Sequence, residues 1–205
     1  MSHNLFLYIV DNMAENFNKI ILASASPRRS EILTNNGVDF EICVSKVEEL
    51  KEAQSPKDLV RQNAMLKAKD VASKHKNRLV LGADTIVVLG NEVFGKPCDE
   101  AEAILMLEKL QGKSHYVYTA IALVCEEKGI EISDMMATEV QFKPLSREDI
   151  LKYINAVYVL DKAGSYAVQD NGAMIINSMG ESFENVMGLD SALVKKHLKE
   201  IFKSI

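Results

Sequence analysis

The stretch Leu79-Val-Leu-Gly-Ala-Asp-Thr-Ile-Val-Val-Leu89 decides how this chain folds. Its eleven residues are almost wholly apolar, a pattern that predicts a central strand buried on both faces. Only Gly82, Asp84 and Thr85 interrupt it. A buried carboxylate costs several kcal/mol unless it has a partner. We therefore expect Asp84 to face a cation, a metal or a polar cleft, or to mark a bend where the strand leaves the core.

A strand followed by a helix is predicted twice before this stretch. Residues 20–23 form a short apolar run, and Ser26-Pro27 then begins a helix that stops near Asn36-Gly37. Residues 38–44 alternate between apolar and polar side chains, the period of a strand with one face in water. A helix of about 18 residues follows, beginning at a capping box whose first residue is Ser55.

The second half of the chain adds strands joined by short turns. Gly90-Asn91 predicts a hairpin, a tight turn joins strands at 117–124 and 130–142, and a further strand is predicted near 173–177. The helices predicted here begin at Asp99 and Ser146 and, at the end of the chain, pass through Leu193 and Phe202. The predicted fold is therefore α/β with α+β features: a mixed, twisted β-sheet with flanking helices. We expect residues 1–17 to be an N-terminal extension and residues 18–205 to form a single domain.

Composition and charge limit the classes of function. The chain has 205 residues, of which 47% are hydrophobic and 26% charged, and its net charge is −5. An acidic balance argues against broad attraction to nucleic acid or membranes, so an anionic ligand must meet a local basic pocket. The three cysteines are far apart, which fits reduced thiols in a cytoplasmic protein and suggests neither a disulfide framework nor a zinc site. The apolar run at residues 5–10 is too short to span a membrane.

Two arginines lie where a helix should disfavour them. If Ser26 caps the helix and Pro27 is its first residue, Arg28 and Arg29 fall in the first turn, at the positive end of the helix dipole. The same helix end attracts anions, as do guanidinium groups. We therefore interpret the loop before this helix as a phosphate-binding site, and expect the unfavourable field to act only when the site is empty.

A lysine lies close to the apolar stripe of the second helix. At about 100° per residue, Lys67 is about 20° from Val60 and about 40° from Val71, so its stem runs along the buried face. One interpretation is a lysine that extends to the solvent edge of that face. The other is an ammonium group that reaches into a cleft.

Several charged residues could together perform phosphoryl chemistry. The cations are Arg28, Arg29, Lys67 and Lys96, and the carboxylates are Glu48, Glu49 and Asp84. If they converge, the cations could neutralise a polyphosphate while the carboxylates hold a divalent ion and orient a water for in-line attack.

Other kinds of site are not supported. The sequence has neither G-x-x-x-x-G-K-[ST] nor G-x-G-x-x-G after a strand, which excludes a P-loop and leaves a dinucleotide fold without support. His115 is interpreted as a structural hydrogen-bonding residue instead of a ligand. The serines at positions 24, 26 and 30 have no histidine near them in the sequence to activate them, so capping and phosphate hydrogen bonding are their expected roles.

Six short segments, in order and spacing, resemble the Maf family. They are Leu22-Ala-Ser-Ala-Ser-Pro-Arg-Arg29, Gly82-Ala-Asp-Thr-Ile-Val87, Gly95-Lys-Pro97, Leu110-Gln-Gly-Lys-Ser-His115 with Thr119, Asp161-Lys-Ala-Gly-Ser-Tyr166 and Val186-Met-Gly-Leu189. Each is short, but six in register over residues 19 to 201 make coincidence very unlikely.

This resemblance implies a fold, an activity and a set of site residues. Maf proteins are nucleoside triphosphate pyrophosphatases that use a divalent cation, Mg²⁺ or Mn²⁺, and have a fold like that of inosine triphosphate pyrophosphatases, with two lobes around a cleft. By resemblance, Asp84 is the general base for the attacking water, and Glu49 is an acidic residue linked to catalysis or, with Asp84, to the metal. The family's phosphate-binding cations correspond to Arg28, Arg29, Lys67 and Lys96, with Ser24 on the same loop; Lys67 and Lys96 are counted with the catalytic residues.

The resemblance also indicates a substrate. In the branch that hydrolyses dTTP and UTP, specificity is associated with an arginine, a threonine and a glutamine that match Arg28, Thr85 and Gln169. The branch specific for 7-methyl-GTP typically has glutamine after the aspartate and glutamate at the late position, and this chain has neither. Pyrimidine triphosphates, including modified ones, are therefore the expected substrates. The alternatives are a modified purine triphosphate such as 7-methyl-GTP, or a nucleotide-binding regulator of cell division.

The chain departs from the family pattern in two places. Near the last helix, the family's Gly-Leu-Pro is replaced by Gly188-Leu189-Asp190, where Asp190 can cap that helix. Before Asp161, a sequence like Gly-Glu-Pro that is usual in the family is replaced by Val157 to Leu160. The second change lies near a segment expected to border the base or a dimer contact. A homodimer is expected only from the family, and neither nucleic acid nor membrane is expected as a partner.

Overall fold

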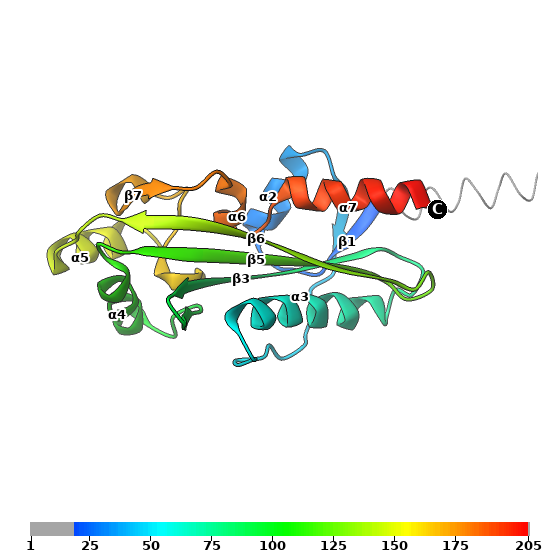
Figure 1. The fold of residues 1–205 in the computed structure, drawn as a ribbon, viewed down its shortest axis with the longest axis horizontal. Helices are drawn as coiled ribbons and strands as arrows, with labels where there is room; N and C mark the ends of the chain where they lie inside the picture. Colours follow the sequence, from blue (N-terminus) through cyan, green and yellow to red (C-terminus); the bar gives the residue numbers. More distant parts are fainter. Residues whose placement is uncertain (1–18, 205) are drawn as a thin grey trace, which may run out of the picture.

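A mixed β-sheet forms the centre of the molecule (Figure 1). The computed structural model describes residues 19–204, so the extension predicted for residues 1–17 lies outside the described residues. Seven strands form the sheet, in the order β2-β1-β3-β5-β6-β7 with β4 paired to β3. The strands are β1 (Lys19–Leu22), β2 (Asp39–Ile42), β3 (Val80–Leu89), β4 (Glu92–Phe94), β5 (Ser114–Cys125), β6 (Ile130–Phe142) and β7 (Ile176–Met179).

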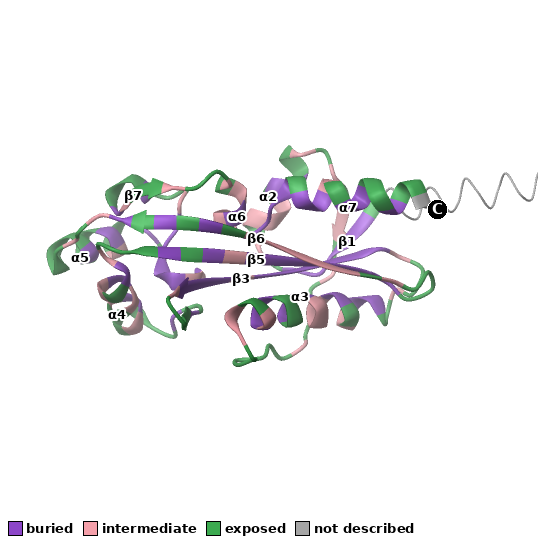
Figure 2. Cartoon of the chain, viewed as in Figure 1, coloured by how far each residue is buried: buried purple, intermediate pink, exposed green. Residues whose placement is uncertain are grey.

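The sheet is mixed, as the hairpin-length turns predicted. Strand β1 pairs in parallel with β2 and β3, while the pairs β3–β4, β3–β5, β5–β6 and β6–β7 are antiparallel. Residues 79–89, predicted to be a central strand, contain β3, which is buried over most of its length (Figure 2). The fold class predicted from the sequence is therefore confirmed.

Helices cover both faces and one end of the sheet. The helices are α2 (Pro27–Asn35), α3 (Pro56–Ala72), α4 (Glu100–Leu110), α5 (Arg147–Ala156), α6 (Phe183–Met187) and α7 (Ser191–Ser204), with short 3₁₀ turns at Ala163–Ser165 and Gly172–Met174. Helix α3 lies against one face and α2 and α7 against the other, while α4 and α5 lie at one end (Figure 1). Each group of helices buries its own apolar cluster against the sheet. No helix in residues 19–204 is long and apolar enough to cross a bilayer.

The central strand has an open stretch along one edge. Strand β5 pairs with β3 from Val80 to Val88 and covers the other edge. On the open side, β1 pairs only as far as Leu81, and β4 begins to pair at Val87. No strand of the described chain pairs with β3 between these two positions on that side. Asp84 and Thr85 lie in this gap, where groups on both faces of the sheet can reach one ligand.

Helix α3 packs unusually close to β3 because Gly82 has no side chain. A Cβ atom at Gly82 would lie 2.3 Å from the carbonyl oxygen of Ala64 and 2.7 Å from the backbone nitrogen of Ala68. Gly82 and Asp84 are two residues apart on the strand, so they face the same side. The close approach therefore brings Lys67, on the same stretch of α3, next to Asp84.

Three local expectations need a correction or a comment, and one helix was not predicted. Ser26 occupies the N-cap position of α2, but its side chain makes no capping hydrogen bond. The strand predicted near residues 173–177 begins only at Ile176, because a 3₁₀ turn occupies the preceding residues. Helix α6 was not predicted, since its five residues are too few to show a period. Asp190 caps α7 as predicted, with its Oδ1 accepting from the Leu193 amide at 2.8 Å.

Replacing Gly82 should separate α3 from the sheet. Because the added Cβ meets backbone atoms that cannot rotate away, Gly82→Ala should lower the free energy of unfolding by about 1–3 kcal/mol, measured by urea denaturation. Gly95→Ala is the matched control, because a Cβ there has no atom within 4 Å. Equal stability of the two variants would contradict the close packing of α3.

Candidate active site

A cleft of about 830 Å³ lies at the open edge of β3. This volume is within the range of about 300–1,000 Å³ that small-molecule sites occupy. All nine predicted site residues line the cleft: Ser24, Arg28, Arg29, Glu49, Lys67, Asp84, Thr85, Lys96 and Gln169. They come from segments that lie far apart in the sequence and that the fold brings together.

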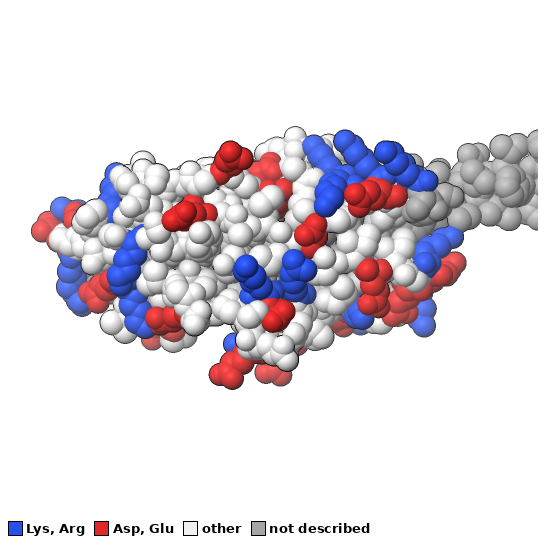
Figure 3. Space-filling model, viewed as in Figure 1, with Lys and Arg blue, Asp and Glu red and all other residues white. Residues whose placement is uncertain are grey.

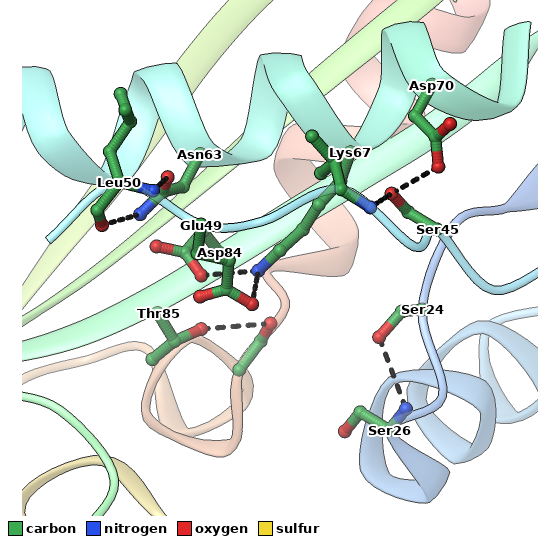
Figure 4. Close-up of polar contacts among 12 residues, drawn as sticks. Ser24, Ser26, Ser45, Glu49, Leu50, Asn63, Lys67, Asp70, Asp84 and Thr85 are labelled. Atoms are coloured by element: carbon green, nitrogen blue, oxygen red, sulfur yellow. Dashed lines mark hydrogen bonds and ion pairs between the residues drawn. The ribbon is translucent and has the colours of Figure 1, made fainter.

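The Lys67 ammonium group joins the two predicted catalytic carboxylates. Its Nζ lies 2.7 Å from Asp84 Oδ1 and 2.8 Å from Glu49 Oε1 (Figure 4). The side chains of Lys67 and Asp84 are only 12% and 8% exposed, whereas that of Glu49 is 55% exposed. The lysine therefore reaches into the cleft, which resolves the two interpretations of its position in favour of the second.

Glu49 is held in place although its segment is neither helix nor strand. The segment runs along α3, where buried Asn63 donates to the carbonyl of Leu50 at 3.1 Å and accepts from its amide at 2.8 Å. Further along, Asp70 accepts hydrogen bonds from the Ser45 hydroxyl and the Lys46 amide, both at 2.8 Å (Figure 4). Asn63 lines the cleft and was missed in the sequence. It could have been recognised in the sequence as a polar amide next to the apolar stripe of α3.

The charges around Glu49 keep it ionised. Partial burial acts to raise its pKa, but the hydrogen bond from Lys67 and the positive charges of Lys67, Lys96 and Arg29 lower the pKa below its ordinary value. Glu48, which was considered with it, lines the cleft without an ion pair in the described chain. Lys96 and Gln169 are exposed on the cleft rim, and neither makes a hydrogen bond to another described residue.

Arg29 is fixed by three acceptors. Its Nε donates to the carbonyl of Gly188 at 2.8 Å, and its two terminal nitrogens donate to Ser24 Oγ at 3.0 Å and Thr85 Oγ1 at 3.1 Å. Burial lowers the pKa of this guanidinium, while the nearby carboxylates of Asp84 and Glu49 act to raise it. An anionic ligand would offset the cost of burying this charge.

Arg28 is paired across the cleft. One terminal nitrogen donates to Asp161 Oδ2 at 2.9 Å, and the other donates to the Asp161 carbonyl at 3.3 Å. The other carboxylate oxygen of Asp161 accepts from Lys162 at 2.8 Å. Partial burial acts to raise the pKa of Asp161, but the hydrogen bonds from Lys162 and Arg28 lower it overall.

These contacts correct one expectation about the empty site. Both arginines were expected to oppose the helix dipole without compensation when no ligand is bound. Instead, protein acceptors already engage each of them. Asp161 and Lys162 line the cleft and were missed as site residues. They could have been recognised in the sequence as two opposite charges just before a glycine, within the segment 161–166 that resembles the Maf family.

Ser24 is free to donate to a ligand. Its Oγ accepts from Arg29 and from the Ser26 amide at 3.2 Å (Figure 4), and its hydroxyl proton has no acceptor among the described residues. Ser24 is buried at the base of the loop that precedes α2. It could therefore donate a hydrogen bond to a phosphate oxygen.

His115 lies in the core, as expected of a structural residue. Its Nε2 lies 2.9 Å from the hydroxyl of Tyr166, and its ring packs edge-on against Phe142 and Tyr166. Burial lowers its pKa to about 4, so the imidazole is neutral at pH 7. It does not line the cleft.

The donor atoms of the site suit a divalent cation that also binds phosphate. Asp84 and Glu49 each keep one carboxylate oxygen free of hydrogen bonds within the described chain. Mg²⁺ prefers oxygen ligands and is usually held by one or two carboxylates together with substrate phosphates. No cluster of three or more metal-ligating side chains occurs in residues 19–204.

The acidic and basic groups of the cleft differ from the surface around them. On the face drawn in Figure 3, lysine and arginine are interspersed with aspartate and glutamate. The arginines and lysines of the cleft instead lie next to paired carboxylates, as the sequence predicted for a local anion site.

Comparison with known proteins gives a consistent result. A family model described as "Maf-like protein" matches residues 19–201. A protein of Bacillus cereus (strain ATCC 10987 / NRS 248) named "dTTP/UTP pyrophosphatase" is 43% identical over 197 residues, which is 96% of each chain. A protein of the same name from Clostridioides difficile (strain 630) is 42% identical over 186 residues, covering 89% of this chain and 95% of its own. A solved structure of the Staphylococcus aureus Ham1 protein aligns with a TM-score of 0.46 and 15% identity, covering 75% of this chain and 89% of that one.

The lowered pKa of Glu49 makes part of the stability depend on pH. Its folded-state pKa lies below the ordinary value of 4.5, so its ion pair stabilises the fold above pH 4.5 and is lost as the pH falls through the folded-state pKa. Glu49→Gln should therefore lower the free energy of unfolding more at pH 7 than at about pH 3, because pH 3 lies below the unfolded-state pKa. Urea denaturation at several pH values measures this, with Glu48→Gln as the control. An equal loss at both pH values would exclude the ion pair as its cause.

Proposed function

The chain belongs to the Maf family, and on this premise we propose that it is a nucleoside triphosphate pyrophosphatase that hydrolyses dTTP and UTP to the monophosphate and pyrophosphate. The observation that carries the proposal is the Lys67 ammonium group bonded to Asp84 and Glu49, in a cleft that also holds Arg29 and Lys96. Such a site combines a carboxylate that can accept a proton with cations that can bind a polyphosphate.

Asp84 is the proposed general base. Its Oδ1 accepts from Lys67, and its other oxygen has no hydrogen bond within the described chain, so that oxygen can accept a proton from an attacking water. The hydrogen bond from Lys67 fixes the orientation of the carboxylate on a central strand. A base held on such a rigid element keeps its geometry when substrate binds.

Lys67 is proposed to let an anionic substrate approach two carboxylates. Without a cation between them, Asp84 and Glu49 would repel each other and the triphosphate. The ammonium group neutralises part of this charge while it stays bonded to both. Arg29, Lys96 and the Ser24 hydroxyl are the proposed ligands for the phosphate oxygens, because each has donors that no described residue uses.

A divalent cation, Mg²⁺ or Mn²⁺, is the proposed cofactor, held by Asp84 and Glu49 together with phosphate. Each carboxylate oxygen has two lone-pair sites, so the free oxygen of Asp84 could hold the cation through one and accept the proton of the water through the other. When bound, it would neutralise phosphate charge and stabilise the leaving pyrophosphate. The choice of pyrimidine triphosphates rests on Arg28, Thr85 and Gln169, which all line the cleft, and on the names of the relatives. A cytoplasmic location and a homodimer stay predictions from the sequence.

A panel of nucleotides tests the activity. Purified protein should convert dTTP and UTP to monophosphate and pyrophosphate in the presence of Mg²⁺ or Mn²⁺, as identified by chromatography of the products. Faster release of pyrophosphate from 7-methyl-GTP would favour the purine alternative. Binding without turnover would favour a regulatory protein, and release of orthophosphate would exclude a pyrophosphatase.

Removing the proposed base should affect the chemical step. Asp84→Asn should lower kcat for dTTP by about 10²–10⁴-fold and largely keep nucleotide affinity, because a base acts in the chemical step and not in ground-state binding. Asp39→Asn, at an exposed position on β2, is the matched control and should keep full activity. Retained turnover in Asp84→Asn would remove Asp84 from this role.

Removing the metal should stop turnover without unfolding the protein. Dialysis against EDTA should abolish hydrolysis of dTTP, and added Mg²⁺ or Mn²⁺ should restore it. The melting temperature should change little, because Lys67 already bridges the two carboxylates in the protein without metal. Full activity in EDTA would contradict the proposed cofactor.

A further inference from the structure

Thr85 is the residue after the proposed base, and its hydroxyl group lies in a chain of hydrogen bonds that leads away from the cleft. Arg29 donates to Thr85 Oγ1 at 3.1 Å, and Thr85 Oγ1 lies 3.0 Å from Thr119 Oγ1. Thr119 Oγ1 in turn lies 2.9 Å from the backbone carbonyl oxygen of Asn185. The chain therefore links α2, β3, β5 and α6.

The donors and acceptors in this chain of hydrogen bonds can be assigned from its last acceptor, the backbone carbonyl of Asn185. A carbonyl oxygen only accepts, so the single hydroxyl proton of Thr119 must point to Asn185. In the hydrogen bond between the two threonines, Thr85 is therefore the donor. A second acceptor for Thr85, the Gly188 carbonyl, is more distant at 3.4 Å (Figure 4). In either case the proton of Thr85 is used within the protein, and its oxygen already accepts from Arg29.

This arrangement gives Thr85 little capacity to hydrogen-bond a ligand. Ser24 differs from Thr85 in this respect, because its hydroxyl proton has no acceptor among the described residues. What Thr85 does contribute is one of the three acceptors that fix Arg29. Arg29 uses three of its five N–H groups in these bonds, which leaves one on each terminal nitrogen for a ligand.

We propose that Thr119 is a positioning residue for triphosphate binding, and that it acts by fixing Arg29 through Thr85. Thr119 is 1% exposed and does not line the cleft, so it cannot contact a substrate directly. Its shortest route to Arg29 is through the hydroxyl of Thr85. A second route, through Asn185 and α6 to the Gly188 carbonyl, predicts additive effects of Thr85→Val and Thr119→Val. The proposal rests on the proposed function, since it takes Arg29 to be a ligand of the triphosphate.

The far end of the chain is itself rigidly held. The side-chain amide of Asn185 donates to the Val117 carbonyl at 3.1 Å and to Thr138 Oγ1 at 2.9 Å, and Asn185 is fully buried. Asn185 lies in α6, and the residue just after that helix, Gly188, supplies the carbonyl that Arg29 Nε contacts. One short helix thus determines two of the contacts that orient Arg29.

The test measures nucleotide affinity in a form that needs no turnover. Isothermal titration calorimetry with α,β-methylene-dTTP and Mg²⁺ gives the Kd of wild type, Thr119→Val, Thr119→Ser and the control Ser133→Ala. Thr119→Val should raise the Kd on the order of tenfold, the effect of disturbing one hydrogen bond to a charged group. Thr119→Ser keeps the hydroxyl and should restore wild-type affinity. Ser133→Ala removes another buried hydroxyl of the sheet, one that makes no hydrogen bond within the described chain, and should change the Kd less than twofold.

A double-mutant cycle separates the proposed chain from a loss of packing. Thr85→Val and Thr119→Val should not be additive: the double variant should bind about as weakly as Thr85→Val alone, because either change breaks the same chain. Wild-type affinity in Thr119→Val, additive effects, or no binding of the analogue by wild type would each overturn the proposal. Wild type that binds the analogue but does not hydrolyse dTTP would instead overturn the proposed function.

Discussion

The ion pair between Lys67 and Asp84 is the interaction on which the site depends. Asp84 lies in the middle of a central strand, where an unpaired carboxylate would cost several kcal/mol. The cation comes from α3, which can approach β3 closely only because residue 82 is glycine. The same ammonium group binds Glu49 and so fixes a segment that has no regular structure of its own. The contact between Lys67 and Asp84 therefore depends on the close packing at Gly82, and it compensates the charge of a buried carboxylate.

The open edge of β3 allows one cleft to use both faces of the sheet. Asp84 and its cation lie on the face covered by α3, while Thr85 contacts Arg29 and α6 on the other. Asp84 and Thr85 are successive residues of β3, so their side chains point to opposite faces of the sheet. Both nevertheless line the cleft, because no strand of the described chain pairs with this edge of β3 between Leu81 and Val87. A metal and a water could then lie beside Asp84 while phosphate groups contact Arg29.

Much of this arrangement could be predicted from the sequence, and the exceptions have physical reasons. The apolar stretch around Asp84, the capping boxes and the hairpin turns gave the strands and most helices, since these signals are local. Seven of the nine predicted site residues were singled out by their charge or by their place before a helix, and the family resemblance added Thr85 and Gln169 and the role of each residue. Asp161 and Thr119 were missed as site or positioning residues because their partners Arg28 and Thr85 lie far away in the sequence. Asn63 and Lys162 were missed because no local pattern shows that they lie at the cleft. The short helix α6 was missed because its five residues are too few to show a helical repeat of apolar residues.

A crystal structure with α,β-methylene-dTTP and Mg²⁺ would test the central claim most directly. The claim is that Asp84, fixed by Lys67, faces the bond to be cleaved while the arginines and Lys96 bind the polyphosphate. We expect the α-phosphate next to the carboxylate of Asp84, and the β- and γ-phosphates against Arg29 and Lys96. A nucleotide bound with its base next to Asp84, or with its phosphates away from Arg29 and Lys96, would contradict this account.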